Sequence, residues 1–245
     1  MVDNPPPDFS KPLKLSPLSR LYFTLEYDLR KSAKVFDERR FDRLVSKHNE
    51  MVEQRNNLFR NTLICDVVVV LLLFGKSITV PGFGVSLADI PAAREAATIA
   101  SGLAFQFAMY AFLNWLGYVA IIETINRHRN EAVDHDIVSA AEKNIEFIEK
   151  LYRSKMNTYG PDYVIPGKSF VVVSRFVVWL GVGSILAILF LHFAIAGFSV
   201  ATTFRELGHS TFAYLFCFAV FASNLAGLLT IITQHIPFKF YLPKS

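Results

Sequence analysis

Four apolar segments are the feature that most constrains how this 245-residue chain can fold. Each is about as long as the roughly 17–25 residues that a bilayer-crossing helix needs, once the first takes in flanking residues. In lipid, a helix is the simple way to satisfy the backbone polar groups of such a segment. The sequence therefore predicts an all-α, four-helix transmembrane protein. The segments are residues 61–74, which can extend to residue 80, and residues 97–122, 170–198 and 211–232.

Positive charge is concentrated on one side of these segments. Twelve of the 25 Lys and Arg residues precede the first segment, seven lie between the second and third, and two follow the fourth. The two opposite loops hold Lys76, Arg94 and Arg205. Cytoplasmic loops carry an excess of Lys and Arg, so the N-terminus, the central segment and the C-terminus are predicted to be cytoplasmic. The predicted localisation is a cell or inner membrane, with the lipid bilayer as the first partner.

The net charge of +4 does not indicate a nucleic-acid-binding protein. Basic residues alternate with Asp and Glu along the chain. Nucleic-acid binding is typical of a denser basic patch or stripe. We therefore expect no nucleic-acid partner.

Composition divides the chain into five regions. The prolines and polar residues at the start predict disorder there. Ser16 and Pro17 are typical of a helix start, and the following helix can lie in the membrane interface or pack on other cytoplasmic helices. Its acidic residues favour packing. The regions are a disordered N-terminus (1–17), cytoplasmic amphipathic helices (18–60), transmembrane helices 1 and 2 with a short outer loop (61–122), a cytoplasmic helical extension and linker (123–168), and transmembrane helices 3 and 4 with a short cytoplasmic tail (169–245).

The long helices are predicted to extend from the membrane into a cytoplasmic helical bundle. Residues 36–60 carry a coiled-coil-like apolar seam and lead into the first span without Pro or Gly, so one helix over about 36–74 is expected. Residues 131–156 carry a second apolar stripe after the second span. Because a short outer loop joins these spans, the two extensions are predicted to pack antiparallel. The proposed packing residues are Phe41, Leu44, Met51, Ile137, Ile145 and Ile148.

Two opposite charges lie inside the predicted spans. Asp66 and Arg175 are each about five residues from the cytoplasmic end of their span, by the boundaries above. A lone charge at the bilayer centre costs roughly 2.5–3.5 kcal/mol on insertion scales. The matched depth predicts that Asp66 and Arg175 pair or line a vestibule, with Glu123 near them. The alternative is that both side chains snorkel to the interface.

Uncharged polar residues are also present inside the spans. Gln106, Asn114 and Asn224 can bond between helices or, in several copies, line a pore. Small residues four apart, such as Ser223 and Gly227, indicate close helix contacts.

Sequence motifs of enzymes and metal sites are absent. The chain has no Walker A loop, G-x-S-x-G, H-E-x-x-H or C-x-x-C motif. His128, Glu131 and His135 share a helix face, but a solvated charged face is the preferred interpretation over a metal site. Asp66 and His192 are expected at opposite ends of their spans, too far apart for a proton-relay pair. We expect a protein that is not an enzyme and has no cofactor.

Three functional classes remain after these exclusions. The first is a homo-oligomeric ion channel or pore gated by its cytoplasmic helical bundle, which Asp66, Arg175 and the polar residues of the spans favour. The alternative is a non-catalytic membrane subunit or sensor that docks and regulates a soluble cytoplasmic partner. A carrier is less favoured because the inverted repeats or broken helices typical of carriers are not visible in the sequence.

Overall fold

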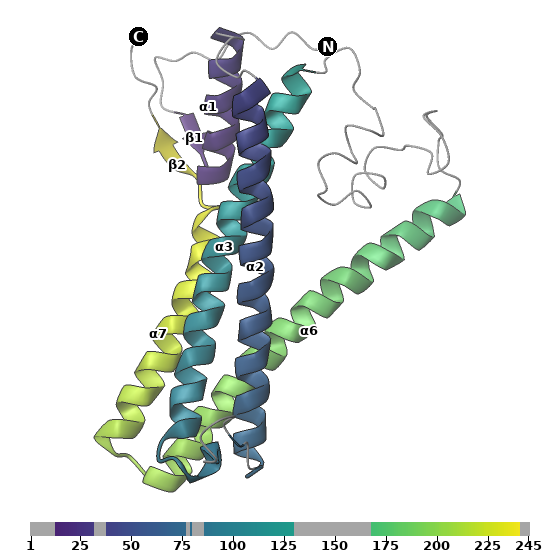
Figure 1. The fold of residues 1–245 in the computed structure, drawn as a ribbon. Coiled ribbons are helices and arrows are strands. Elements are labelled where there is room, and N and C mark those ends of the chain that lie inside the picture. Colours follow the sequence, from purple (N-terminus) through teal and green to yellow (C-terminus); the bar gives the residue numbers. More distant parts are fainter. Residues whose placement is uncertain (1–12, 32–37, 77–78, 80–85, 130–167, 241–245) are drawn as a thin grey trace.

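The chain folds almost entirely into helices. The structure, a computed structural model, describes residues 13–31, 38–76, 79, 86–129 and 168–240. Four of its helices are long and apolar enough to cross a membrane, as the sequence predicts. Figure 1 shows them in one elongated bundle. In chain order the elements are β1 (Leu13–Leu15), α1 (Pro17–Lys31), α2 (Glu38–Leu73), the short 3-10 helix η2 (Leu87–Asp89), α3 (Ala93–Arg129), α6 (Lys168–Leu207), α7 (Thr211–Thr233) and β2 (Phe238–Phe240).

Helices α2 and α3 form a long antiparallel hairpin (Figure 1). They have 36 and 37 residues, or about 55 Å each at 1.5 Å per residue. Because the hydrocarbon core of a bilayer is about 30 Å thick, one hairpin end must project beyond it. The predicted single helix over 36–74 is confirmed, and the second span continues to Arg129. We call the two ends of the bundle the termini end, where β1 and β2 lie, and the loop end, where η2 lies.

Residues 38–60 pack against the second half of α3. Asp66 contacts Ser101, and His48 contacts Trp115. In an antiparallel hairpin, residues equally distant from the connection between the helices face each other. The predicted partner, residues 131–156, lies outside the described residues. Phe41, Leu44 and Met51 are partly buried on α2, whereas Ile137, Ile145 and Ile148 lie outside the described residues.

The described structure begins at Leu13, inside the region (1–17) that the sequence predicts to be disordered. Leu13–Leu15 pairs antiparallel with Phe238–Phe240, with Leu13 opposite Phe240. Ser16 then accepts a hydrogen bond from the Ser19 backbone N–H at 3.3 Å, which confirms the predicted helix start. Helix α1 packs on α3, and Leu29 is buried. This small sheet joins the two ends of the chain at one end of the bundle.

Helix α6 contacts the bundle mainly through its second half. Figure 1 shows its first half diverging from the other helices. The apolar side chains along that half are exposed to whatever surrounds the protein, which in a membrane is lipid or another protein. They include Val172, Phe176, Trp179, Leu180, Ile185 and Leu186.

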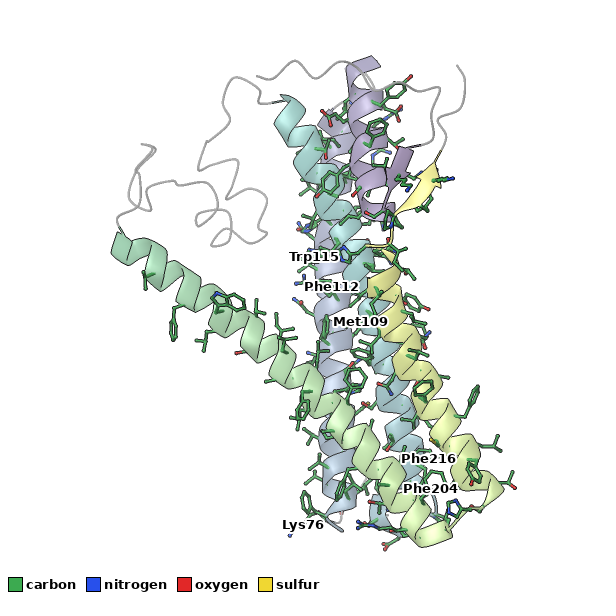
Figure 2. The ribbon with its side chains drawn as sticks, turned by 180° about the vertical axis from the view of Figure 1, so that it is seen from behind. Lys76, Met109, Phe112, Trp115, Phe204 and Phe216 are labelled. Atoms are coloured by element: carbon green, nitrogen blue, oxygen red, sulfur yellow. The ribbon has the colours of Figure 1, made fainter. Side chains whose placement is uncertain are left out.

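Two apolar clusters fill the space between the helices. The first is centred on Phe105, Ala108 and Met109 of α3, toward the termini end. The second, nearer the loop end, joins Ala196 of α6 to Phe216 and Val220 of α7. Figure 2 shows this arrangement, with Met109 labelled midway along the bundle and Phe216 near its loop end.

Close approach of α3 and α7 depends on two glycines. A methyl group at Gly227 would lie 2.8 Å from the Phe105 ring. At Gly102 it would clash with Ser223 Oγ and lie 3.0 Å from Asn224 Nδ2. The predicted close contact at Ser223 and Gly227 is therefore confirmed, and its counterpart on α3 is Gly102.

Gly102→Ala and Gly227→Ala should each destabilise the folded protein by about 1–3 kcal/mol, the usual cost of overpacking. Gly197→Ala is the matched control, because nothing lies within 4 Å of its added methyl group. That helical substitution should be neutral or stabilise by about 0.5–1 kcal/mol. Thermal unfolding in detergent measures all three. Equal effects at the three positions would contradict this account of helix packing.

Candidate functional site

Each of the four long helices contributes one polar side chain to a buried cluster. Asp66 comes from α2, Ser101 from α3, His192 from α6 and Asn224 from α7, and each residue is 3–6% exposed. A group left unpaired at this depth in lipid is costly, so polar side chains here need one another. We call these four residues the polar cluster.

Asp66 and His192 are joined directly. The Nδ1 atom of His192 lies 3.0 Å from both carboxylate oxygens of Asp66. The hydroxyl of Ser101 donates to Asp66 Oδ1 at 2.5 Å. On the other side of the imidazole ring, His192 Nε2 lies 2.8 Å from Asn224 Oδ1. The polar cluster thus runs without a break across four helices.

Asn224 fixes the direction of these hydrogen bonds. Its Nδ2 donates to the backbone carbonyl of Val220 at 2.8 Å, so its Oδ1 is the atom that faces His192. An amide oxygen can only accept, and His192 Nε2 must therefore carry a hydrogen. The remaining nitrogen, Nδ1, faces the carboxylate. A hydrogen bond between Asp66 and Nδ1 therefore requires a hydrogen on either the carboxylate or Nδ1.

Loss of that proton would turn attraction into repulsion. A carboxylate would then face the lone pair of Nδ1, because Nε2 still holds its hydrogen for Asn224. The contact between α2 and α6 at this point therefore depends on that hydrogen.

The surroundings of His192 hold the imidazole ring in place. Phe105 stacks on it with ring centroids 4.7 Å apart, and Phe193 meets it edge-on at 5.3 Å. Among the described residues, Asp66 is the charged side chain in contact with His192. From α3 the ring meets Phe105, and from α7 it meets Asn224, which are both uncharged.

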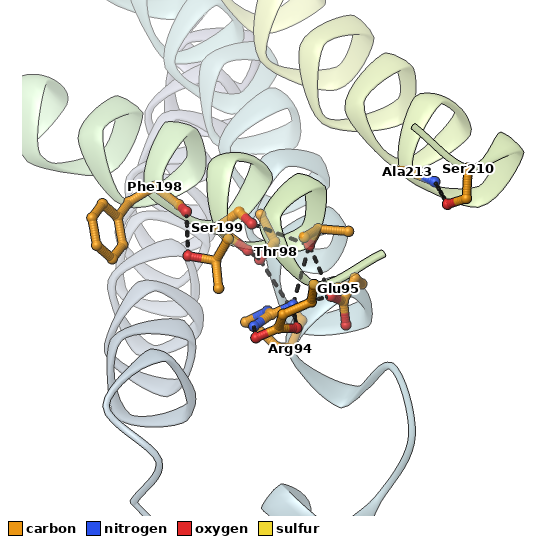
Figure 3. A network of polar contacts seen from close by, with 10 residues as sticks. Arg94, Glu95, Thr98, Phe198, Ser199, Ser210 and Ala213 are labelled. Carbon is orange, nitrogen blue, oxygen red and sulfur yellow. Dashed lines mark hydrogen bonds and ion pairs between the residues drawn. The ribbon is translucent and has the colours of Figure 1, made fainter. Parts of the chain in front are cut away.

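A second polar cluster lies near the loop end, where α3 begins and α6 ends (Figure 3). Arg94 makes two bonds to Glu206, at 3.0 and 2.8 Å, and also pairs with Glu95. Thr203 donates to Glu95 at 2.8 Å. Two carboxylates thus share one guanidinium, in the bidentate geometry that Arg favours.

A third polar contact lies toward the termini end. The indole N–H of Trp115 donates to His48 Nε2 at 3.1 Å, and both side chains are buried. The guanidinium of Arg55 lies 4.1 Å from the centre of the Trp115 ring. This cation–π contact joins α2 to α3 where the hairpin is richer in polar residues.

The predicted Asp66–Arg175 pair is wrong. Asp66 meets His192 of α6, and Arg175 lies in the same helix roughly 25 Å along the axis at 1.5 Å per residue. The side chains of Arg175 and Glu123 lie outside the described residues. The expectation that Asp66 and His192 are far apart is also wrong. That expectation measured depth as the number of residues from the end of each span. Because α6 is long and oblique (Figure 1), the same number of residues does not give the same depth in every helix.

The three predicted polar positions have different surroundings. Asn224 belongs to the polar cluster. Gln106 bonds to the Tyr110 hydroxyl at 3.1 Å on the outer face of α3, and Asn114 is exposed. Sequence reasoning missed Ser101 as a site residue and set His192 aside. A histidine in an otherwise apolar span was the available signal, since such a group needs a partner in lipid.

No metal site is formed by the residues that the structure describes. No three His, Cys, Asp or Glu side chains among them lie close enough to hold a metal ion. Comparison with protein-family models, with curated proteins and with solved structures finds no match for this chain. Function is therefore argued from the polar cluster itself.

Asp66→Leu should destabilise the protein by about 1–3 kcal/mol, because it leaves His192 Nδ1 buried without its partner. His192→Leu should do the same to Asp66. The double variant should recover part of the loss, with a coupling of about 0.5–3 kcal/mol. Thermal unfolding of the four proteins in detergent measures this coupling.

Arg175→Gln supplies the matched control for this cycle. Combined with Asp66→Leu, it should give strictly additive effects, because the two residues are distant. Coupling between Asp66 and Arg175, and none between Asp66 and His192, would contradict the geometry of the polar cluster.

Proposed function

We propose that the protein is an integral membrane channel whose conducting state is set by the proton between Asp66 and His192. The observation that carries this proposal is the hydrogen-bond pattern of the polar cluster, in which Asn224 leaves one exchangeable proton to join α2 to α6. Buried acid–histidine pairs in membranes are typical of proton-dependent function. Four membrane-crossing helices are compatible with this class of protein.

Gating follows from how α6 is attached. Its second half is held partly by polar contacts, with His192 bonded to Asp66 and Ser199 bonded to Thr98. Between helices in lipid there is little hydrophobic driving force, so such bonds matter to helix position. With the proton bound, α6 is held against α2 and the channel is closed. Release of the proton leaves a carboxylate facing a lone pair and frees α6 to move.

Conduction is proposed to need several copies of the chain. The interior of one copy is occupied by the clusters around Phe105 and Phe216. The exposed apolar side chains of α6 and the outward-facing Gln106 and Asn114 of α3 are available to neighbouring copies. The excess of positive charge at the termini end supports a cytoplasmic location for that end.

A non-catalytic subunit that binds a soluble partner is the second candidate. One observation favours it: the hairpin projects beyond the length a bilayer can cover, and α2 carries a polar surface hollow there. Its lining includes Asn49, Glu53, Asn56 and Asn57. Recovery of a soluble protein in fixed ratio, without conductance, would support this candidate over the channel.

Current across planar bilayers containing the purified protein should rise as pH rises and the bound proton is lost. Asp66→Asn should remain closed at every pH. Its amide can donate to His192 Nδ1 and accept from Ser101, which keeps both bonds but removes the exchangeable proton. Asp66→Leu, which removes the bond, should conduct at every pH.

Asp89→Asn is the matched control, because Asp89 is exposed in η2 at the loop end. It should follow the wild-type pH dependence. Folded yield by size-exclusion chromatography separates loss of function from loss of fold. A wild-type current that does not respond to pH, or an Asp66→Asn current that does, would overturn the proposal.

A further inference from the structure

We propose that the proton at Asp66 and His192 exchanges with water at the loop end of the bundle, through a polar seam between α3 and α6. The termini end is closed to it by an apolar plug. This inference rests on the proposed function, because it assigns the side from which the same site is protonated. The protein would then respond to pH on one side of the membrane.

The seam consists of polar side chains on the facing sides of α3 and α6. On α3 it comprises Glu95, Thr98 and Ser101, which are three residues apart and share one helix face. On α6 the matching residues are Thr203 and Ser199, followed by His192. The three α3 residues and the three α6 residues are all buried. Each level of the seam is bonded across the two helices or, at Ser101, to Asp66.

The bonds across the seam lead from the surface to the polar cluster. At the outermost level, Glu206 is exposed and bonds to Arg94, which also bonds to Thr203 at 3.2 Å. Thr203 then donates to Glu95 at 2.8 Å. Figure 3 labels Arg94 and Glu95 of this level near Thr98 and Ser199 of the next.

The inner levels of the seam complete the route. Thr98 and Ser199 bond hydroxyl to hydroxyl at 2.7 Å. One helical turn further along α3, Ser101 donates to Asp66. A hydroxyl can accept one proton and donate another, so each level can pass a proton without holding a charge. Transfer between successive levels, which are three residues apart on α3, is part of the proposal.

The side of the polar cluster toward the termini end has a different character. Phe105, Ala108 and Met109 fill the space there. Apolar side chains from the other three helices pack against them, and these are Leu58, Phe59, Leu189, Phe193, Leu228 and Ile231. These side chains cannot relay a proton. The buried hydroxyl on this side, Thr62 of α2, donates to the Leu58 carbonyl of its own helix at 3.0 Å, whereas Thr98 and Ser199 bond across two helices on the loop side.

Several titratable and charged groups lie around the route. At its mouth, Glu95 and Glu206 share Arg94, and Arg205 is the exposed cation beside Glu206 on α6. At its inner end, Asp66 and the neighbouring Cys65 are the titratable groups on α2. Helix α7 contributes the uncharged Asn224. A proton taken from water at Glu206 or Glu95 moves inward by successive hydroxyl exchange to the carboxylate of Asp66, and the reverse path returns it.

The decisive measurement is the side from which Asp66 is protonated. Oriented proteoliposomes are given a pH step in the outer medium, and protonation is followed by the infrared band of the Asp66 carboxyl group, assigned by its loss in Asp66→Asn. Vesicles with the loop end outside should respond promptly. Vesicles with the termini end outside should respond only as the internal pH drifts.

A variant of the seam tests the route itself. Thr98→Val with Ser199→Ala removes both hydroxyls and leaves Asp66 and His192 unchanged. It should slow protonation from the loop end by about tenfold. That is the change in rate expected when one stabilising hydrogen bond is lost from the transition state. Thr230→Val is the control, because that hydroxyl bonds to its own helix at Ala226, outside the seam. The equilibrium titration should be the same in all variants.

The outcomes separate this inference from the proposed function. If the Asp66 band titrates equally fast from both ends, or faster from the termini end, the seam is not the route although the proton site stands. If the seam variant matches wild type, the route is also excluded. If the band does not titrate with either orientation, the proposed function fails as well.

Discussion

The hydrogen bond between Asp66 and His192 joins α2 to α6 in a region where neither side chain can be left without a partner. An unpaired polar group in hydrocarbon costs several kcal/mol, so the helices must bring these groups together. Ser101 and Asn224 extend the same requirement to α3 and α7. The relative position of all four helices therefore depends on satisfying one cluster of hydrogen bonds.

The packing around the polar cluster serves the same requirement. Gly102 lets α7 come close enough for Asn224 to reach His192, and Phe105 stacks on the imidazole ring. Apolar contacts between membrane helices resemble apolar contacts with lipid, so they add close packing but little direction. Direction comes from the polar bonds. Because polar bonds, and not apolar contacts, set the position of α6, this helix can be exposed along its first half and still be held by its second half.

The same pattern gives the bundle two unlike ends. Toward the loop end, polar residues recur on α3 at Ser101, Thr98 and Glu95, and on α6 at Ser199 and Thr203 after the apolar turn of Ile195 and Ala196. Toward the termini end, the apolar Phe105 cluster comes first, and the buried Thr62 on α2 bonds to its own helix at Leu58. The proposed exchange with one side of the membrane rests on this difference.

Much of the fold was predictable because it depends on local sequence. The length of the apolar segments predicts four membrane helices, and the absence of Pro and Gly over residues 36–60 predicts that α2 is continuous. The residue pairs of the candidate site were not predictable in the same way. The pairing of α2 with α3 required counting from the turn. The pairing of Asp66 with His192 required the tilt of α6, which no span boundary contains.

The sequence by itself determined that four helices are long and apolar enough to cross a membrane, and that they carry an acid, a histidine and an asparagine, each of which would need a partner in lipid. Only the tertiary structure decided that these three meet, because depth in a membrane depends on helix tilt as well as on residue count. It also decided the direction of each hydrogen bond, since the orientation of Asn224 follows from the backbone carbonyl of Val220. Local sequence sets which polar side chains on each helix require a hydrogen-bond partner. The packing of the four helices decides which partner each of them contacts.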